Sequence, residues 1–496
     1  MKKYIGMRIL RSLLSLIVVI GIVFILIYKY IPKENIFVVD SNISKYNGDA
    51  KINYRYTAWE KYGYLDYVTT AEYCMATYSE GSSERSTCIA NGQSYMDDFV
   101  KTYQDKGYTI AYYDKSQLPF AYKNVNTFRM LLNWFANILS FDNTNKVQNE
   151  NMVDEDRGIY LGTDWNGVPA VMCYGCEHKY LLYFDGKFPF IHSNWLTINL
   201  GSSYPTYANI PIVDVIGDRQ GALVNKDVTF PSGVTETSAI MEHTCSYKAT
   251  LNAIEKRRFT DNYADCDSYQ ADASMIGTSF FIGIIASLLS YLLGVPLGML
   301  MARYKDKLFD KLGMAYIIFI TSVPSLAYIF MFSRIGGAWL GLPTKFSFYG
   351  AHVASSYILP IISLALPSAA GLMMWIRRYM LDQSNSDYVK FARAKGMSER
   401  EIMTTHIMRN AIIPIAHNIP LDICFALVGA IITERVYAVP GMGKMLTDSI
   451  NNYNNSMIVA LTFIYTGLSI IGLIAGDLLM AVIDPRISFE SKGGRR

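Results

Sequence analysis

The sequence lacks the motifs that identify several common kinds of catalytic site. It contains no G-x-x-x-x-G-K-[ST] phosphate-binding loop, since Gly441-Met-Gly443-Lys444 has the wrong spacing, and the chain is therefore not expected to hydrolyse ATP by itself. It also contains no H-E-x-x-H zinc signature and no G-x-S-x-G nucleophile elbow. These absences argue against an ATPase, a zinc peptidase and an α/β hydrolase, and the sequence predicts no catalytic residue and no metal centre.

The chain also lacks a large net charge, but its value of +3 over 496 residues is the sum of two opposite regions. Residues 30–273 contain 30 acidic and 21 basic side chains, a net of −9, and the rest of the chain contains 12 acidic and 24 basic ones, a net of +12. The basic region is also the apolar one, which argues against a nucleic-acid-binding protein. We therefore expect regions that lie in different surroundings.

Charged residues are absent from several long apolar runs. A hydrocarbon core of about 30 Å is crossed by about 20 apolar residues in a helix, and the sequence contains six runs near that length: 12–28, 275–301, 312–332, 355–376, 411–433 and 457–481. The first is followed by Tyr28-Lys29-Tyr30-Ile31-Pro32 and not by a small-residue cleavage site, so we expect an uncleaved anchor and not a signal peptide. The sequence predicts a mainly α-helical protein with six transmembrane helices.

The distribution of Lys and Arg predicts the orientation of these spans, because basic residues near a span are retained on the cytoplasmic side. With the N-terminus inside, the cytoplasmic segments carry 19 basic residues, against four in the two short outside loops, 333–354 and 434–456. Both termini are therefore expected to be cytoplasmic. The predicted organisation has four parts: the N-terminus and first span at 1–29, an extracellular domain at 30–273, the other five spans at 274–485 and a cytoplasmic tail at 486–496.

The predicted extracellular domain contains six of the seven cysteines, and an even number in an oxidising compartment predicts disulfides. Sequence alone leaves open all 15 ways of pairing six cysteines in three disulfides. The simplest pairs neighbours: Cys74 with Cys88, Cys173 with Cys176, and Cys245 with Cys266. Cys173-Tyr-Gly-Cys176 also has the spacing of a redox pair, or of part of a metal site with His178. The domain holds 24 of the 37 tyrosines and short alternating stretches, so we expect an α+β fold with its own core.

Residues 128–141 form an apolar stretch that is too short to cross a membrane. Trp134 lies at the edge of the helical face that collects its other large apolar residues: Leu131, Leu132, Phe135, Ile138 and Leu139. Two interpretations stay open. One is an amphipathic helix at the lipid interface, and the other is an ordinary helix in the core of the extracellular domain.

The longest predicted cytoplasmic segment begins with a short helix. Ser386 or Asp387 is expected to cap its first turn, and the helix is expected to run to Lys395, where Gly396 supplies the left-handed stop. The helix mixes apolar and basic side chains and has little core to bury against in an isolated loop. We expect it to insert into a groove of a cytoplasmic partner and to transmit the partner's motion to the span behind it.

A second helix is expected directly after this turn. Ser398-x-x-Glu401 has the form of a capping box, and the helix that it starts leads into the fifth predicted span. A basic segment lying on anionic membrane lipid is the alternative interpretation. The paired caps and the central glycine favour docking to a protein.

The segment Asp387-Tyr-Val-Lys-Phe-Ala-Arg-Ala-Lys-Gly-Met-Ser-Glu-Arg, with His406-Ile-Met-Arg-Asn-Ala-Ile-Ile-Pro414, resembles the coupling loop of ABC-importer permeases of the dipeptide/oligopeptide subgroup. Other stretches resemble the same subgroup: Gly294-Val-Pro-Leu-Gly298, Leu366-Pro-Ser-Ala-Ala-Gly-Leu-Met-Met-Trp-Ile-Arg377, Glu434-Arg-Val-Tyr-Ala-Val-Pro-Gly-Met-Gly443 and Asp484-Pro-Arg486. The resemblance covers 1–30 and about 275–490, and the insertion is similar in size to that of the larger Ami-type permeases. Lys390-Phe391-Ala392 depart from the Glu-Ala-Ala of importers in general, so single contacts to the ATPase are not carried over.

The resemblance implies the type I ABC-importer permease fold, in which this chain couples partner ATPases to alternating access for oligopeptides. It places the coupling loop at 387–410, with these residues expected to form it: Asp387, Tyr388, Val389, Phe391, Ala392, Arg393, Ala394, Lys395, Gly396, Ser398 and Glu401. The implied partners are a second homologous permease, two ATP-binding subunits and an extracellular peptide-binding lipoprotein, in the plasma membrane of a bacterium. The ATP-binding subunits would hold ATP and Mg²⁺, and this chain would carry no cofactor.

Two ionisable residues of the predicted fifth span, His417 and Asp422, are candidates for the translocation path or for the interface between permeases. Asp422 lies about 17 Å along a helix that starts at Ala411, at about 1.5 Å per residue. That depth is close to the bilayer centre, where a charge needs a polar cavity or a partner. Asp477, near the cytoplasmic end of the last span, is expected to pair with a basic neighbour such as Arg486.

Two other functions remain as alternatives. A membrane receptor or sensor would bind a ligand through its extracellular domain and would need a cytoplasmic output domain, whereas the longest inside segment is the 34-residue loop 377–410. A membrane thiol oxidoreductase using Cys173 and Cys176 would need a further cysteine pair in the membrane, where the predicted spans contain only Cys424.

Overall fold

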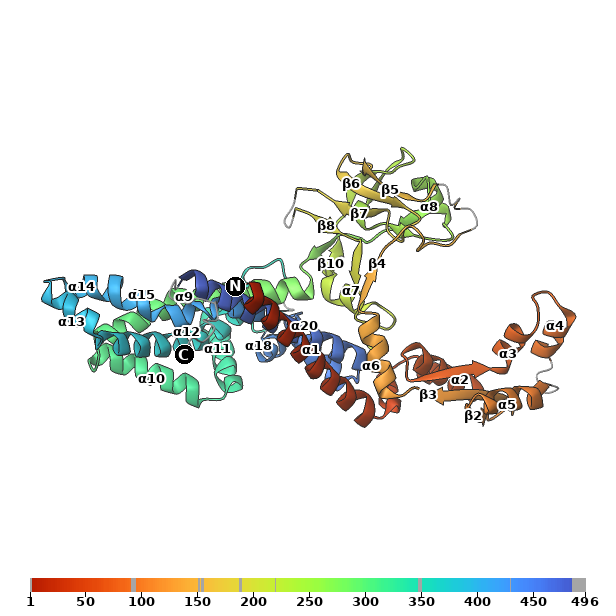
Figure 1. Cartoon of the computed structure of the whole chain (residues 1–496), viewed down its shortest axis with the longest axis horizontal. Coiled ribbons are helices and arrows are strands. Elements are labelled where there is room, and N and C mark those ends of the chain that lie inside the picture. Colours follow the sequence, from red (N-terminus) through yellow and green to blue (C-terminus); the bar gives the residue numbers. More distant parts are fainter. Residues whose placement is uncertain are drawn as a thin grey trace, which may run out of the picture.

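The computed structural model describes residues 2–90, 95–149, 152, 156–186, 190–218, 220–346, 350–428 and 430–483. The predicted tail, 486–496, lies outside the described residues. Figure 1 shows a bundle of helices at one end of the molecule and two lobes at the other, with both lobes built from the residues between α1 and α9. We call these residues, 30–273, the insertion.

Four helices among the described residues are long and apolar enough to cross a membrane. They match four of the six predicted spans: α1 (Lys2–Tyr30), α9 (Met275–Arg303), α12 (Ser355–Ser384) and α20 (Asn455–Ile483). The predicted span at 312–332 is instead divided between α10 (Leu308–Ser322) and α11 (Ser325–Leu340), which are bent by 113°. Pro324 lies at the break, where a residue without an N–H cannot continue the ladder of helical hydrogen bonds.

The predicted fifth span, 411–433, is not one continuous helix. Its residues lie in short helices that follow one another: α15 (Met408–Ala411), α16 (Ile413–Ala416), α17 (Ile419–Val428) and α18 (Ile431–Tyr437). Pro414 and Pro420 lie near two of the breaks. The count of six transmembrane helices therefore stays a prediction. A further short helix, α19 (Met442–Asn451), precedes α20.

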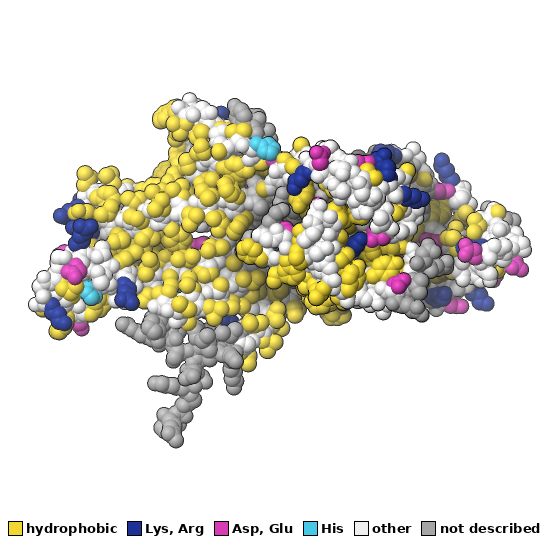
Figure 2. Space-filling model, turned by 90° about the horizontal axis from the view of Figure 1, so that it is seen from above, with side chains coloured by type: hydrophobic (Ala, Val, Ile, Leu, Met, Phe, Trp, Pro, Cys, Tyr) yellow, Lys and Arg dark blue, Asp and Glu magenta, His cyan; other side chains and the backbone are white. Residues whose placement is uncertain are grey.

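α9 and α12 form the centre of the bundle. A Cβ atom at Gly294 would lie 2.7 Å from the Cβ atom of Leu372, and one at Gly298 would lie 2.8 Å from the Cβ atom of Ile376. Only glycine allows this approach, which is the role of small residues four apart in membrane helices. The outer surface of the bundle is broadly apolar, and charged side chains gather at the end of the molecule opposite the insertion and on the insertion itself (Figure 2).

The first lobe of the insertion is a three-stranded antiparallel sheet with strand order β1-β3-β2, covered by helices. Its elements are α2 (Asp49–Lys61), β1 (Leu65–Thr69), α3 (Thr70–Thr77), α4 (Ser83–Ala90), α5 (Met96–Asp105), β2 (Thr109–Tyr112) and β3 (Pro119–Asn124). Tyr67 and Tyr122 are paired across β1 and β3. Tyr67, Trp59 and Phe120 are buried in the aromatic core, so tyrosines of the insertion serve as core residues here.

The second lobe is mostly β-structure. Its four-stranded antiparallel sheet consists of β5 (Gly158–Thr163), β6 (Pro169–Tyr174), β7 (Tyr180–Tyr183) and β8 (His192–Ser193). Two-stranded ribbons surround it: β4 (Leu139–Phe141) with β9 (Leu196–Ile198), β10 (Gln220–Leu223) with β15 (Gln270–Asp272), β11 (Lys226–Thr229) with β12 (Thr235–Ser238), and β13 (Ser246–Tyr247) with β14 (Tyr263–Asp265). Two short helices complete the lobe: α7 (Ile212–Gly217) and α8 (Ala253–Arg258).

The six cysteines of the insertion are paired as the simplest prediction has them. The disulfides are Cys74–Cys88 in the first lobe, and Cys173–Cys176 and Cys245–Cys266 in the second. All three close short loops within a lobe, so each lobe carries its own crosslinks.

The helix α6 (Thr127–Ala136) connects the two lobes (Figure 1). Its Leu131 packs against Phe24 of α1 and Val459 of α20, and Trp134 makes an edge contact with Phe463 of α20. The helix also packs against the core of the first lobe through Met130, while Phe128 and Leu132 are exposed. It fixes the insertion to two membrane helices.

Candidate functional site

The helix predicted in the cytoplasmic segment is present as α13 (Asp387–Ala394), and Figure 1 places it at the end of the bundle farthest from the insertion. One face of α13 is fully packed: Val389 and Ala392 are buried against Ile376 and Met380 of α12 and against Ile402. The expectation that this helix has little core to bury against is therefore wrong. The residues that cover it come from α12 and from the chain beyond the turn.

The opposite face of α13 is open to solvent. The side chain of Phe391 is 64% exposed, with the Lys395 ammonium 4.8 Å from the centre of its ring. The Lys390 ammonium lies 2.9 Å from the Asp387 carboxylate, which makes this an ion pair within one turn and not a contact with the rest of the bundle. α13 thus has one face fixed to the spans and one aromatic and basic face free for a partner.

The turn after α13 has the predicted left-handed glycine and Ser398 cap, but the second bond of the predicted capping box is absent from the described contacts of Ser398. Lys395 ends the helix, and Gly396 follows at a φ of +79°, the left-handed conformation that glycine adopts without strain. The Ser398 hydroxyl accepts the backbone N–H of Glu401 at 3.3 Å and so caps α14 (Glu399–Glu401). At the first helix, however, the Ser386 side chain makes no capping bond, and Asp387 is paired with Lys390.

The turn is braced by the Arg393 guanidinium, which donates to both carboxylate oxygens of Glu399 at 2.6 and 3.1 Å. The chain then continues through a π-helical turn, Ile402–Ile407, into α15. Ile402 and Ile407 are buried in the same cluster as Val389. α13, the turn and the start of the fifth predicted span are therefore one packed unit.

A cavity of about 400 Å³ lies deeper in the bundle, between α9, α12, α17 and α18. Much of its wall is apolar, but eight hydroxyl or carboxyl side chains line it: Ser279, Ser287, Ser290, Tyr291, Ser368, Asp422, Thr433 and Glu434. Among the described lining residues none is basic. The cavity is thus a mainly apolar space with two carboxyl groups in its wall.

Both carboxylates of the cavity have partners from distant segments. The Tyr291 hydroxyl of α9 donates to Asp422 Oδ2 of α17 at 2.6 Å. Glu434 is buried and accepts the Ser279 hydroxyl at 2.7 Å and the backbone N–H of Lys444 at 3.0 Å. These bonds hold α17 and α18 to α9, and they give each carboxylate a hydrogen-bond donor.

The comparisons with known proteins agree with these features. Residues 294–489 match the family described as binding-protein-dependent transport system inner membrane component. The oligopeptide transport system permease protein AmiC of Streptococcus pneumoniae serotype 4 is 38% identical over 505 residues, which cover 100% of both chains. The chain belongs to this family of ABC-importer permeases. The resemblance to the dipeptide/oligopeptide subgroup is confirmed, and because the match covers the whole chain, AmiC shares the insertion.

Other relatives match the permease over a shorter stretch. The dipeptide transport system permease protein DppB of Lactococcus lactis subsp. cremoris is 31% identical over 216 residues, or 43% of this chain and 70% of DppB. Among solved structures, an inward-facing form of the MetNI methionine ABC transporter covers 42% of this chain and 94% of that chain at 13% identity, with a TM-score of 0.35. That score is too low to support an argument from the MetNI structure.

The structure separates the two candidate path residues of the permease. Asp422 lines the cavity, whereas His417 is absent from its described lining and packs against α20, where a Cβ atom at Gly476 would lie 2.4 Å from the His417 carbonyl oxygen. The His417 ring is 3.8 Å from Asp477. Asp477 itself is paired with Arg8 of α1. The basic partner of Asp477 thus comes from the first helix, and the expected partner Arg486 lies outside the described residues.

Glu434, Ser279 and Tyr291 were not predicted as site residues. Glu434 opens one of the stretches that resemble the family. Gly441, later in the same stretch, is the signal that could have identified its role. A Cβ atom at Gly441 would lie 2.4 Å from Glu434 Oε2, so the glycine is required where a buried carboxylate reaches the backbone. Ser279 and Tyr291 gave no such signal, because their partners lie 155 and 131 residues away.

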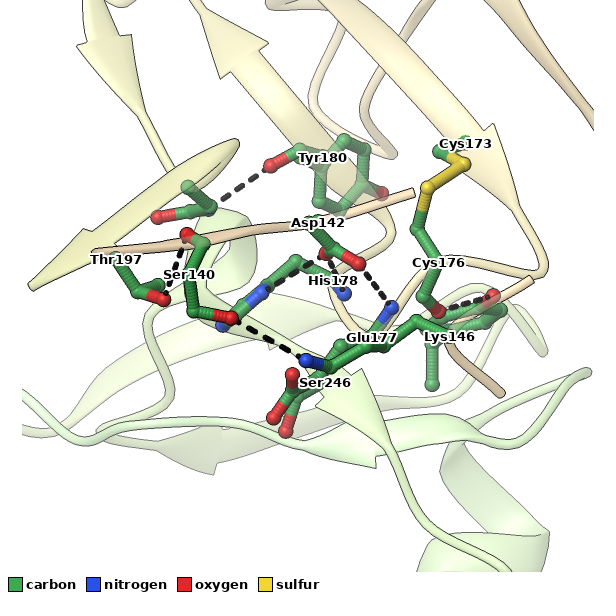
Figure 3. Close-up of polar contacts among 12 residues, drawn as sticks. Ser140, Asp142, Lys146, Cys173, Cys176, Glu177, His178, Tyr180, Thr197 and Ser246 are labelled. Atoms are coloured by element: carbon green, nitrogen blue, oxygen red, sulfur yellow. Dashed lines mark hydrogen bonds and ion pairs between the residues drawn. A yellow bond between two sulfur atoms is a disulfide. The ribbon is translucent and has the colours of Figure 1, made fainter. Parts of the chain in front are cut away.

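Cys173 and Cys176 form a disulfide, so in this state neither offers a thiolate to a metal site with His178. Figure 3 shows the two sulfurs bonded to each other, and both cysteines are buried. The His178 Nδ1 atom lies 3.2 Å from Asp142 Oδ2, and the Asp142 carboxylate also accepts the backbone N–H groups of Glu177 and His178, each at 2.8 Å. His178 therefore serves to hold the loop after the disulfide to Asp142.

Proposed function

We propose that this permease is one subunit of an ATP-driven oligopeptide importer and forms half of its translocation path. The match over the full length to AmiC, whose name describes oligopeptide transport, supports the choice of substrate class. A second homologous permease would supply the other half of the path. A membrane receptor or sensor is not favoured, because the whole chain matches a permease.

The observation that carries the proposal is the two-faced packing of α13. Its exposed face, with Phe391 at the centre, would dock into a groove of an ATP-binding subunit, which holds ATP and Mg²⁺. Its buried face, with Val389 and Ala392, would pass the displacement to α12 and to the chain leading to α17. A rigid element at an interface converts closure of the motor subunits into a tilt of the helices behind it.

The cavity beside Asp422 is the proposed part of the path in this subunit. Asp422 and Glu434 make it acidic, and its described lining has no compensating basic residue. An acidic cavity of low polarity favours a cationic group, and the amino terminus of a peptide is such a group. Asp422→Asn should therefore weaken uptake of peptides with a free amino terminus more than that of N-acetylated peptides.

The proposed topology places both termini and α13 in the cytoplasm and the insertion outside, in the plasma membrane of a bacterium. The acidic insertion would then meet an extracellular peptide-binding lipoprotein that delivers substrate. Specificity for peptides would rest mainly with that protein, because a path for varied peptides needs few specific contacts.

The test uses Phe391→Ala in the complete importer reconstituted in liposomes. Truncation of a central aromatic anchor at an interface costs about 2 kcal/mol or more, so we expect peptide-stimulated ATPase activity and peptide uptake to fall at least tenfold. The matched control is Tyr304→Ala. Tyr304 is also a partly exposed aromatic residue with a cation over its ring, since Arg303 lies 5.5 Å from the ring centre, but it is outside α13 and the turn.

The proposal fails if Phe391→Ala and Tyr304→Ala behave alike, or if the purified chain recruits no ATP-binding subunit. Stimulation of ATP hydrolysis by amino acids or sugars and not by peptides would contradict the substrate class while leaving the coupling role of α13 intact.

A further inference from the structure

Three metal-ligating side chains converge in the second lobe of the insertion, away from every feature used above. Asp164, Glu242 and His243 each offer one ligand atom, and the three atoms lie within 4.8 Å of one another. Asp164 directly follows β5, and the other two belong to the short 3₁₀ turn Glu242–Thr244 between β12 and β13. The fold thus brings together residues almost 80 positions apart in the sequence.

The Asp164 carboxylate has one oxygen fixed in the turn and the other directed at the cluster. Its Oδ1 atom accepts the backbone N–H groups of Asn166 and Val168 at 2.9 and 2.6 Å, which fixes the carboxylate in the β5–β6 turn. Its Oδ2 atom points toward His243, and the side chain is 0% exposed. An aspartate that only stabilises a turn needs the bonds from the backbone N–H groups, but it does not need a buried second oxygen directed at a histidine.

The His243 ring is also fixed in place. It stacks on Tyr183 with 4.2 Å between ring centres, and Asn194 donates to the His243 carbonyl at 2.7 Å. Its Nε2 atom lies 2.8 Å from Asp164 Oδ2, an ion-pair distance when the ring is protonated. A metal ion binds neutral imidazole and ionised carboxylate, so it would replace any proton between these two atoms.

We propose that Asp164, Glu242 and His243 bind a divalent transition-metal cation, with zinc as the best match. One imidazole nitrogen and two carboxylate oxygens are zinc ligands, and two donors on one zinc ion at about 2.0–2.1 Å from it lie roughly 3.3 Å apart. The 2.8 Å between His243 Nε2 and Asp164 Oδ2 is shorter than this value, and no two of the three donor atoms are more than 4.8 Å apart. Small side-chain movements therefore complete the site. Calcium takes six to eight oxygen ligands and fits this set poorly.

The proposed ion would act as a crosslink. It would join the β5–β6 turn to the turn before β13, next to the Cys245–Cys266 disulfide. The second lobe has small ribbons and little continuous core, and in such a lobe metal binding adds directly to the free energy of folding.

The test measures zinc bound to the purified full-length chain in mild detergent. The protein is stripped with a chelator, dialysed against zinc chloride and analysed for metal by mass spectrometry, with manganese and calcium as comparison cations. We expect each chain to bind one zinc ion, and we expect this binding to require Asp164. The melting temperature should be higher with zinc than without it.

The decisive variants are Asp164→Asn and His243→Gln. Asparagine keeps an oxygen for the two turn N–H groups and replaces the ligating oxygen by an amide, so the turn is retained while the site is lost. Loss of a metal ligand should weaken zinc binding at least tenfold, the lower bound even for outer residues of a metal site.

The matched control is His192→Gln. His192 stacks on Tyr183 with 4.7 Å between ring centres and lies 3.0 Å from an Asp185 oxygen, but it is not one of the three converging donors. Its substitution should leave zinc binding within twofold of the starting value. The proposal is overturned if the stripped chain binds no more zinc than Asp164→Asn does, if His192→Gln weakens binding as much as His243→Gln, or if calcium is preferred to zinc.

Discussion

The glycine turn after α13 gives the most direct test of the proposed coupling. Gly396 has a φ of +79°, and a Cβ atom added there would meet no atom within 4 Å. The cost of Gly396→Ala is therefore the cost of the left-handed backbone alone, about 1–2 kcal/mol. Gly396→Pro costs more, because proline fixes φ near −65° and removes an N–H, the one that donates to the Arg393 carbonyl at 3.0 Å.

These costs predict a graded loss of coupling. A penalty of 1–2 kcal/mol raises the population of the opened turn by about 5- to 30-fold, so Gly396→Ala should reduce peptide uptake moderately, while Gly396→Pro should abolish it. In liposomes, peptide-stimulated ATPase activity should fall in step with uptake. Assembly of the importer should persist, because the buried contacts of Val389 and Ala392 do not involve this glycine.

The control is the same pair of substitutions at Gly341. This glycine ends α11 at a φ of +65°, and a Cβ atom there also meets no atom within 4 Å. The backbone cost is thus matched, but Gly341 is far from α13 in the chain and in the fold. Normal uptake by Gly396→Pro would refute the coupling role of the turn, and equal losses at the two glycines would show that general destabilisation explains the effect.

Three further predictions concern stability. The Arg377 guanidinium donates to the buried Asp310 carboxylate at 2.6 and 2.7 Å, and Asp310→Asn removes this counter-charge. The substitution should lower the free energy of unfolding in detergent by about 3 kcal/mol, measured by chemical denaturation. Asn454→Ala should leave the Ser203 hydroxyl without the 2.7 Å bond that ties the insertion to α20, cost about 1–3 kcal/mol and speed hydrogen exchange in that loop. Burial by itself would raise the pKa of Asp142, but hydrogen bonds from the His178 ring and from two backbone N–H groups hold the pKa below its usual value. The stability that Asp142 adds is therefore present above about pH 4 and is lost as the pH falls through the lowered folded pKa. Asp142→Asn should remove this acid sensitivity in a fluorescence-monitored acid titration.

The parts of the fold that the sequence predicted correctly depend on neighbouring residues. The C-terminal end of α13, the left-handed Gly396 and the Ser398 cap are set by a few adjacent side chains and by backbone sterics. The disulfides also join near neighbours in sequence. In each case the partners lie within about 20 residues, so a local pattern contains the information.

The features that sequence could not supply depend on long-range packing. The amphipathic face of α6 is compatible with lipid, with the core of the insertion or with another helix, and only the fold shows that Leu131 of this face packs against α1 and α20 while Leu132 stays exposed. The buried side of α13 was missed for the same reason. Asp422 could be recognised as an unusual residue in an apolar run, but its partner Tyr291 could not, since the two are brought together by the packing of α9 on α17.

The position of α20 links the insertion to the cavity and limits how the permease can move. At the end of α20 nearest the insertion, Asn455 donates to the Tyr64 hydroxyl of the insertion at 2.8 Å. Halfway along α20, a Cβ atom at Gly472 would lie 2.8 Å from the Cα atom of Leu421 in α17. The helix that holds the insertion is thus also in backbone contact with the helix that carries Asp422. If α17 tilts when α13 is displaced, α20 has to tilt with it or this contact has to break. Because interfaces packed this closely shift between discrete arrangements and do not deform continuously, the insertion should move as a rigid extension of α20 during transport, and not as a flexible cover over the entrance.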